Sequence, residues 1–236
     1  MNRFNTTRWS LVLRAQSSGG DARSALETLC RTYRPPVLAY IRGRGYSSDV
    51  AEDLTQSFFA QFLERVGHAD ADPARGRFRA FLLTAIKRFL INATAEAHAL
   101  KRGGRIHFES IDSSPHDAEI VPTGSESPEQ VFERAWALVV LDAALRRLRE
   151  EARVADKREL FDHLRGFLTE TPDEADYTRV AAAMNLRRNT VAVAVHRLRH
   201  RLRELVHEEL AQTAAGGEDF EVELRELRTA LGSGMT

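Results

Sequence analysis

Arginine side chains gather in one stretch near the end of the chain, from Thr178 to Leu205. Guanidinium groups bind the phosphates of nucleic acids and read guanine in the major groove, so this clustering suits DNA recognition. The other interpretation is an arginine-rich helix face that contacts only water. The whole chain is charge-balanced, with 34 basic and 34 acidic side chains. Six arginines lie within seventeen residues, without an acidic residue among them: Arg187, Arg188, Arg197, Arg199, Arg201 and Arg203.

The apolar spacing around these arginines predicts a helix-turn-helix. Residues spaced 4, 3, 4 and 3 apart share one helix face: Val191, Val195, Leu198, Leu202 and Leu205. The opposite face carries Asn189, Val193, His196 and His200, with Arg197 and Arg203 beside them. Just before it, "YTRVAAAM" predicts a short apolar helix and "NL" a tight turn. Two helices joined by so short a turn, the second one basic, are typical of a helix-turn-helix with a recognition helix.

Helical periodicity dominates the remaining sequence, and alternating strand patterns are nearly absent. Between Arg105 and Arg134 the chain has seven acidic residues and no lysine or arginine, a composition too polar for a core. We therefore expect an all-α fold of two helical domains joined by a flexible acidic linker. Pro35 and Pro36 are expected to end the first helix. The expected division is a leader at 1–20, a first domain at 21–102, the linker at 103–130, a second domain at 131–206 and an acidic extension at 207–236.

Two segments together resemble a known family. "SDVAEDLTQSFFAQFLER" followed by "RGRFRAFLLTAIKRFLI" is similar to region two of the extracytoplasmic-function (ECF) RNA polymerase sigma factors. "YTRVAAAMNLRRNTVAVAVHRLRHRLREL" is similar to region four of the same family. The resemblance implies a protein that binds core RNA polymerase and promoter DNA and performs no covalent chemistry. The alternative is a stand-alone helix-turn-helix regulator or adaptor whose first domain binds another protein.

The resemblance also implies roles for individual residues. Region two would dock on polymerase through Glu52, Asp53 and Gln56, although an acid such as Glu52 could instead only offset the helix dipole. The loop from Asp72 to Arg79 would capture a flipped base of the promoter −10 element, or be only a surface connection. The expected −10 contacts are Arg75, Arg77, Arg79, Lys87 and Arg88. The expected −35 contacts are Arg187, Arg188, Asn189, His196, Arg197 and His200.

Several positions depart from the family pattern. Phe81 stands where the family often has tryptophan, and Phe89 where it often has asparagine. Arg187 caps the recognition helix in place of the usual serine or threonine. Small apolar residues replace polar base readers at Ala192, Val193 and Ala194. The sequence of the −35 element therefore stays open.

Two features suggest regulation. Thr55 lies beside Asp53 and Gln56, and Ser57 stands where many relatives have an acid, so a Ser/Thr protein kinase could switch polymerase docking by phosphorylating Thr55. The other interpretation of Thr55 is a boundary residue that covers Phe59. Between Glu204 and Leu231 the chain has eight acidic residues and only two arginines. This extension could mask the basic helix, or pack on the second domain for stability alone.

Other functional classes find little support in the sequence. A glycine-rich phosphate loop is absent, and His196 and His200 lack a third ligand, so we expect no enzyme activity, no metal site and no cofactor. Cys30 is the single cysteine, which excludes an intrachain disulfide and favours a reducing interior. No apolar run is long enough to cross a membrane. We expect a cytoplasmic protein without a membrane partner.

Overall fold

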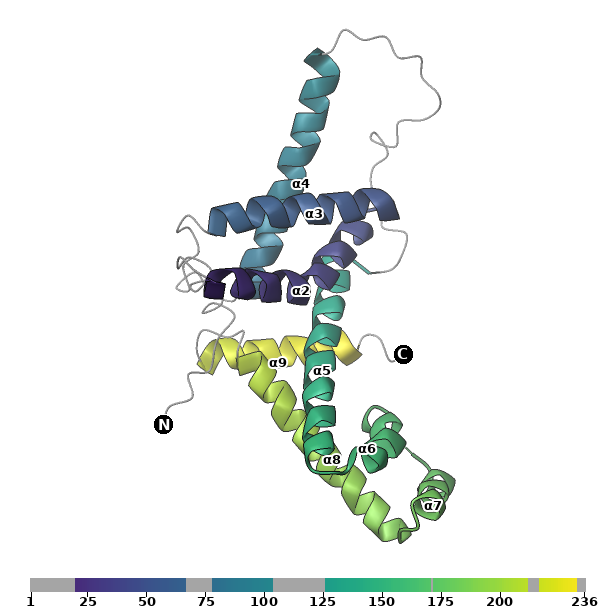
Figure 1. The fold of residues 1–236 in the computed structure, drawn as a ribbon. Helices are drawn as coiled ribbons and strands as arrows, with labels where there is room; N and C mark the ends of the chain where they lie inside the picture. Colours follow the sequence, from purple (N-terminus) through teal and green to yellow (C-terminus); the bar gives the residue numbers. More distant parts are fainter. Residues whose placement is uncertain (1–19, 67–77, 104–125, 171, 212–216, 233–236) are drawn as a thin grey trace. The chain divides into compact units, whose positions relative to one another are not determined.

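The computed structural model describes residues 20–66, 78–103, 126–170, 172–211 and 217–232 (Figure 1). These residues form helices and connecting turns without a strand, which confirms the predicted all-α fold. In chain order the elements are α2 (Gly20–Gly43), α3 (Ser48–Val66), α4 (Phe78–Gly103), α5 (Pro128–Val154), α6 (Arg158–Leu164), η2 (Arg165–Leu168), α7 (Glu174–Ala183), α8 (Arg188–Ala211) and α9 (Gly217–Gly232).

The chain divides into two compact units. The first unit contains Met1–Ala137 and Gln212–Thr236, and the second contains Leu138–Ala211. The chain passes from the first unit to the second within α5. This division differs from the expected one, because the beginning of α5 and the whole of α9 belong to the first unit. The expected boundary between linker and second domain, at residue 130, lies inside α5.

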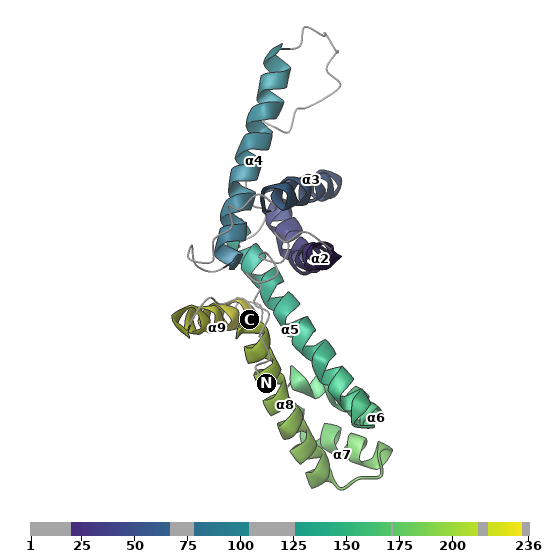
Figure 2. The same cartoon turned by 60° about the vertical axis from the view of Figure 1, so that its left-hand side comes forward.

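Aromatic side chains fill the core of the first unit. Helices α2 and α3 lie side by side, and α4 packs against α3 (Figures 1 and 2). Tyr33 of α2 meets Phe78 of α4 edge-on, with ring centroids 5.0 Å apart. Phe58 and Phe62 of α3 stack at 5.4 Å, and Phe58 also contacts Phe89 of α4. Phe89 thus takes part in the core at a position where the resembled family often has a polar residue.

Helix α2 continues through Pro35 and Pro36, so the prediction that these prolines end the helix was wrong. A proline within a helix removes one backbone hydrogen bond and crowds the preceding turn. Burial on both sides offsets this cost, because Tyr33, Val37 and Ile41 are each at most 1% exposed. Tertiary packing here outweighs the local preference of the chain.

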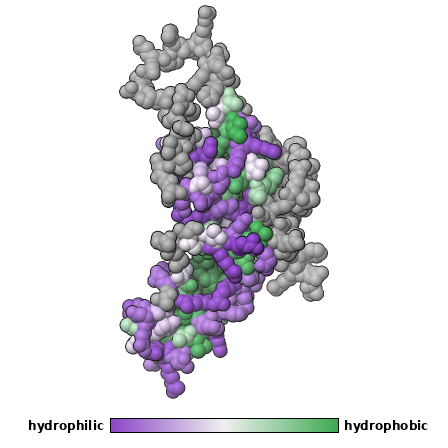
Figure 3. All heavy atoms as spheres, turned by 180° about the vertical axis from the view of Figure 1, so that it is seen from behind, coloured by the Kyte–Doolittle hydropathy of each residue, from purple (hydrophilic) through white to green (hydrophobic). Residues whose placement is uncertain are grey.

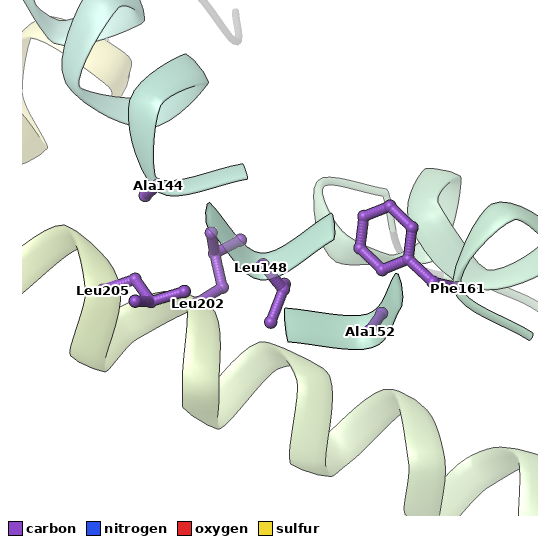
Figure 4. Packing of buried hydrophobic residues seen from close by; sticks show 6 residues of the cluster. All are labelled: Ala144, Leu148, Ala152, Phe161, Leu202 and Leu205. Carbon is purple, nitrogen blue, oxygen red and sulfur yellow. The ribbon is translucent and has the colours of Figure 1, made fainter. Parts of the chain in front are cut away.

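Two apolar clusters form the core of the second unit. In the first, side chains of α5 and α8 face each other, as Figure 4 shows for Leu148, Leu202 and Leu205. The second cluster joins α6, η2, α7 and the beginning of α8. Helix α5 ends where Lys157 donates its backbone N–H to the Ala152 carbonyl (2.8 Å), a termination that leaves Asp156 at a φ of 55°.

Hydrophilic side chains cover most of the described surface seen in Figure 3, with apolar patches between them. The large apolar side chains that are exposed lie on several helices, among them Ile91 (68% exposed) on α4 and Val154 (73%) on α5. Within the described ranges, no helix combines the length and the hydropathy that crossing a membrane requires. No group of three or more His, Cys, Asp and Glu residues in the same ranges is arranged to hold a metal ion.

Candidate nucleic-acid and protein-binding surfaces

A tight turn joins α7 to α8 and is closed by backbone hydrogen bonds. Leu186 donates to the Ala181 carbonyl (2.8 Å), and Asn185 donates to the Ala182 carbonyl (3.3 Å). This pattern ends a helix on a residue in the left-handed region, here Asn185 with a φ of 52°. Asparagine adopts this conformation more readily than most residues do. The predicted "NL" turn is therefore confirmed, and α8 begins immediately after Arg187.

Packing beneath the turn decides which face of α8 meets solvent. Val180 of α7 contacts the cluster that contains Val191 and Val195 of α8, and none of these three is more than 4% exposed. The beginning of α7 is fixed by a capping box, in which the Asp173 carboxylate accepts the backbone N–H of Asp176 (2.8 Å). Since Val191 and Val195 point into the core, the opposite face of α8 is exposed.

All six residues predicted for −35 recognition lie on this exposed part of the second unit: Arg187, Arg188, Asn189, His196, Arg197 and His200. Arg188 forms an ion pair with Glu174 of α7. His200 Nδ1 lies 3.2 Å from Glu204 Oε1, one turn further along α8. Val193, on the same face, is 42% exposed. The face thus combines cations, an amide and a small apolar contact, which are the groups that read base edges.

The remaining arginines of the basic stretch do not belong to one open surface. Arg199 donates to the backbone carbonyls of Phe167 (2.9 Å) and Glu170 (2.8 Å). Arg201 pairs with Glu151 of α5 at 2.7 Å, and with Glu204 and Glu208 of its own helix. These contacts raise the pKa of Arg201 and lower the pKa of Glu151. The arginines look unopposed in sequence, but α5 and the connection after α6 supply partners for two of them.

Helix α3 presents the residues predicted to dock on polymerase. Asp53 and Gln56 are exposed. Glu52 is half-buried and pairs with Arg34 and Arg42 of α2, the latter at 3.5 Å. This observation favours neither a pure dipole role nor a free docking contact for Glu52, because its carboxylate links α3 to α2. The exposed acid of the predicted set is Asp53.

Thr55 is fully buried, at 0% exposure, and its hydroxyl donates to the Ala51 carbonyl (2.6 Å). A kinase needs an accessible hydroxyl, and a fully buried threonine does not offer one. The expectation that Thr55 is a phosphorylation site is therefore wrong for the folded domain. The boundary interpretation was nearer, since Thr55 lies on the core side of α3. Ser57, two residues further, is exposed.

Arg79 does not contact solvent, so its predicted role in −10 binding is corrected. Its side chain is 3% exposed and pairs with Glu133 of α5 and with Glu223 and Glu226 of α9. Its guanidinium carbon lies 4.1 Å from the ring centre of Trp136. Arg75 and Arg77 lie outside the described residues. Lys87 and Arg88 are exposed on α4, with Lys87 Nζ 2.8 Å from Glu129.

A groove beside Lys87 adds further groups of the kind that hold single-stranded nucleic acid. It has a volume of about 500 Å³. Lys87 and Arg44 supply positive charge, Tyr46 an aromatic ring, and Ile91 an exposed apolar side chain. Aromatic rings stack with bases while cations follow the phosphates. Its lining residues are Tyr40, Arg44, Tyr46, Lys87, Leu90, Ile91, Thr94 and Glu129.

Two comparisons with known proteins give significant matches to this chain. Residues 29–98 match the family described as sigma-70 region 2. The chain is also similar to the ECF RNA polymerase sigma factor SigE of Mycolicibacterium smegmatis (strain ATCC 700084 / mc(2)155), with 28% identity over 184 residues. That alignment covers 78% of this chain and 60% of the relative, and no solved structure gives a significant match. The chain is thus similar to an ECF sigma factor over most of its length, and to sigma-70 region 2 within its first unit.

Within this chain, the region 2 match runs from the middle of α2 to the later part of α4. It therefore includes the exposed Asp53 and Gln56, the buried Thr55 and the groove residue Lys87. The match ends before α5, so Glu129, Glu133 and Trp136 lie outside it. They nevertheless contact α4 in the first unit. The compact unit around region 2 is thus larger than the matched segment.

Sequence reasoning missed the cluster around Arg79. The spacing of the apolar residues of the tail, Phe220, Leu224, Leu227 and Leu231, predicts an amphipathic helix from the sequence, and α9 confirms this prediction. The predicted packing site of this helix was wrong, because we expected it to pack on the second domain or on its basic helix. Glu223 and Glu226 instead contact Arg79 of α4, in the first unit. Trp136 and the acids flanking the apolar stripe of α9 were the signals available in the sequence.

Proposed function

We propose that this chain works as an ECF-type sigma factor that binds core RNA polymerase and directs promoter-specific initiation of transcription. One observation carries the proposal: the chain combines a sigma-70 region 2 with a helix-turn-helix whose recognition face is exposed and basic. A protein that works with polymerase in this way acts in the bacterial cytoplasm. The chain spans 60% of the length of its relative.

Polymerase docking is assigned to the exposed face of α3. Asp53 and Gln56 supply a carboxylate and an amide to the partner. Glu52 contributes by pairing with Arg34 and Arg42, which holds α3 against α2. Carboxylates on a rigid helix favour a basic partner surface, and the arrangement costs little entropy because the helix is already formed.

The −35 element is assigned to the beginning of α8. A recognition helix reads bases with its first turns, where Arg188, Asn189 and Val193 are exposed. Asparagine pairs with adenine, arginine with guanine, and an apolar side chain contacts the thymine methyl group. His196, Arg197 and His200 lie further along the same face and suit phosphates or neighbouring bases. Arg187 precedes the helix and suits a phosphate.

The −10 element is assigned to Lys87 and Arg88 on α4, with the groove that contains Arg44 and Tyr46 as additional support. Arg75 and Arg77 stay candidates by sequence alone. Lys87 already pairs with Glu129, which raises the pKa of the lysine through their hydrogen bond, so Lys87 remains a cation at neutral pH.

Run-off transcription with core polymerase on genomic fragments tests the proposal. We expect discrete transcripts with the wild type and a loss of about tenfold for Gln56→Ala, since about 1.4 kcal/mol of docking energy corresponds to that factor. Gln61→Ala, an exposed glutamine of the same helix, is the matched control and should transcribe normally. Specific DNA binding without any association with polymerase would instead favour a stand-alone helix-turn-helix regulator.

A Ser/Thr kinase remains a proposed partner only at the exposed Ser57. A phosphate there would add about −1.5 to −2 charges beside Asp53, where it could pair with basic groups of polymerase. We expect Ser57→Glu to strengthen core binding and Thr55→Glu to unfold the first unit, because Thr55 has no access to water. Equal core binding by wild type and Ser57→Glu would remove the kinase from the proposal.

A further inference from the structure

The recognition helix α8 begins with arginines and without an acid. Arg187 directly precedes the helix, Arg188 is its first residue, and its first turn contains no acidic side chain. The N-terminal end of a helix carries a partial positive charge, so anions are favourable there and cations are not. The beginning of α8 therefore attracts negative charge, either from another part of the chain or from DNA.

Glu174, the first residue of α7, supplies such a charge. Its Oε1 forms an ion pair with Nη1 of Arg188, although the two residues are 14 positions apart in the chain. Both side chains are exposed, Glu174 at 76% and Arg188 at 57%. Water screens an exposed ion pair, which therefore contributes little to stability. The main consequence of this contact is the direction that it gives to the Arg188 side chain.

The backbone fixes the place of Glu174 beside the start of α8. A capping box closes the first turn of α7, and backbone hydrogen bonds close the turn that leads from α7 to α8. Val180 of α7 and Val191 of α8 are buried in the same apolar cluster. Because a packed core leaves its helices little freedom to shift, the carboxylate stays within reach of Arg188.

The ion pair leaves part of the guanidinium available for DNA. Arginine has five N–H donors, and the contact with Glu174 uses those of Nη1 alone. The part of the chain that the structure describes provides no contact to Nε or Nη2 of Arg188. A guanine accepts two hydrogen bonds from one guanidinium, at O6 and N7. Arg188 can therefore read a guanine while it keeps its contact with Glu174.

A phosphate meets a different situation at the same arginine. Phosphate oxygens are negative, as is the carboxylate of Glu174, so the two repel each other and compete for one cation. The edge of a base is uncharged and meets no such repulsion. Like charges placed side by side are a means of disfavouring a wrong partner. Glu174 thus disfavours the contact that every DNA sequence offers and leaves the contact that depends on sequence.

We propose that Glu174 is a positioning residue, which directs Arg188 toward a base edge and away from the phosphates and thereby raises the specificity of −35 recognition. The inference rests on the proposed function, because it takes the beginning of α8 as the reading surface. Glu174 acts through Arg188 and need not touch DNA itself. Without its carboxylate, the chain should still fold and bind DNA, with Arg188 turned to a phosphate.

Binding of the full chain to duplex DNA tests this role. The probe is the tightest duplex that the wild type selects from a random pool, and the reference is the same duplex with its sequence scrambled. Glu174→Gln removes the charge and keeps the size of the side chain. We expect it to tighten binding to the scrambled duplex by about two- to fivefold, the range that corresponds to an exposed ion pair. A gained phosphate contact should also make the slope of log affinity against log salt more negative by about 0.9.

The matched control is Glu159→Gln on α6, because Glu159 is an exposed glutamate for which the described residues provide no ion pair. It removes the same charge and should change binding to both duplexes by one common factor. Glu174→Gln should instead reduce the preference for the selected sequence at a single base pair. Arg188→Ala should lose its preference at that same base pair, and adding Glu174→Gln to it should change no further preference.

The possible outcomes separate this inference from the function on which it rests. If Glu174→Gln and Glu159→Gln change binding to both duplexes equally, Glu174 acts only through net charge, and the inference fails while −35 recognition by α8 stands. A change of base preference caused by Glu174→Gln in the Arg188→Ala background would also overturn it, because Glu174 would then act without Arg188. If the wild type selects no common sequence from the pool, the proposed reading surface is rejected and the inference with it.

Discussion

Arg79 and Arg201 each form ion pairs with three glutamates, but the side chain of Arg79 is buried and that of Arg201 is partly exposed to water. The partners of Arg79 are Glu133, Glu223 and Glu226, and those of Arg201 are Glu151, Glu204 and Glu208. The side chain of Arg79 is 3% exposed and that of Arg201 is 36% exposed. Water screens the charges around Arg201 and reaches them if a partner is lost, whereas the charges around Arg79 depend on one another. Burial, more than the number of partners, separates a structural arginine from a surface one.

The largest effect is expected when the Arg79 cluster is broken. Arg79→Ala leaves Glu223 buried without its cation and removes the cover of Trp136. We expect the free energy of unfolding of the first unit to fall by about 3–5 kcal/mol, the usual cost of breaking a buried ion pair. Chemical denaturation followed by tryptophan fluorescence measures this, because Trp136 lies 4.1 Å from the guanidinium.

The matched control for that prediction is Arg88→Ala, on the exposed side of the same helix. An exposed substitution away from special contacts changes stability by about 0.5 kcal/mol or less. Arg88→Ala should instead weaken the binding of single-stranded −10 DNA. If Arg79→Ala and Arg88→Ala proved equally stable, the proposed difference between a buried and an exposed arginine in α4 would be untenable.

The sequence could predict the helix-turn-helix because its determinants are local. Val191 and Val195 mark the buried face of α8, and the turn that contains Asn185 follows directly from the preceding residues. The role of Arg79 could not be predicted in this way, because Glu226 lies 147 residues further along the chain. An arginine beside a polar loop has the same local pattern whether it faces DNA or a distant helix.

Two other errors have the same physical origin. Pro35 and Pro36 satisfy every local rule for the end of a helix, yet burial of Val37 and Ile41 keeps α2 intact. Thr55 was placed beside Asp53 by counting along the helix, although a step of two residues crosses from the exposed face to the core. Local patterns therefore predict elements well, whereas long-range packing decides which residues of an element are accessible.

An intermediate effect should separate two arginines of α8 that are two residues apart. Arg197 is exposed on the recognition face, while Arg199 donates to the carbonyls of Phe167 and Glu170. We expect Arg197→Ala to weaken promoter binding by about 1–3 kcal/mol if Arg197 reads guanine, and by less if it binds phosphate. Arg199→Ala should lower stability and leave the specificity for the −35 sequence unchanged.

Affinities for promoter DNA and for DNA with a scrambled −35 element distinguish these roles. An equal loss on both templates after Arg197→Ala would show a phosphate contact in place of base reading. A loss of specificity by Arg199→Ala at unchanged stability would contradict the division between a recognition face and a structural arginine.

The smallest effect is expected at Arg201, and it should depend on pH. The hydrogen bonds with Arg201 hold the pKa of Glu151 and of Glu204 below the ordinary carboxylate value of 4.5. A carboxylate whose pKa is lowered on folding stabilises the fold above that ordinary value, and this contribution is lost as the pH falls through the lowered pKa.

At neutral pH we expect Arg201→Gln to lower the free energy of unfolding by at most about 1 kcal/mol, because the pairs are exposed. The difference from wild type should shrink on acidification below about pH 4, where both proteins have lost the charged pairs. Arg203→Gln, an exposed arginine of the same helix for which the described residues provide no ion pair, is the control and should show a pH-independent difference. A difference for Arg201→Gln as large as that for Arg79→Ala, or one that grows in acid, would mean that exposure does not set the strength of these two otherwise similar clusters.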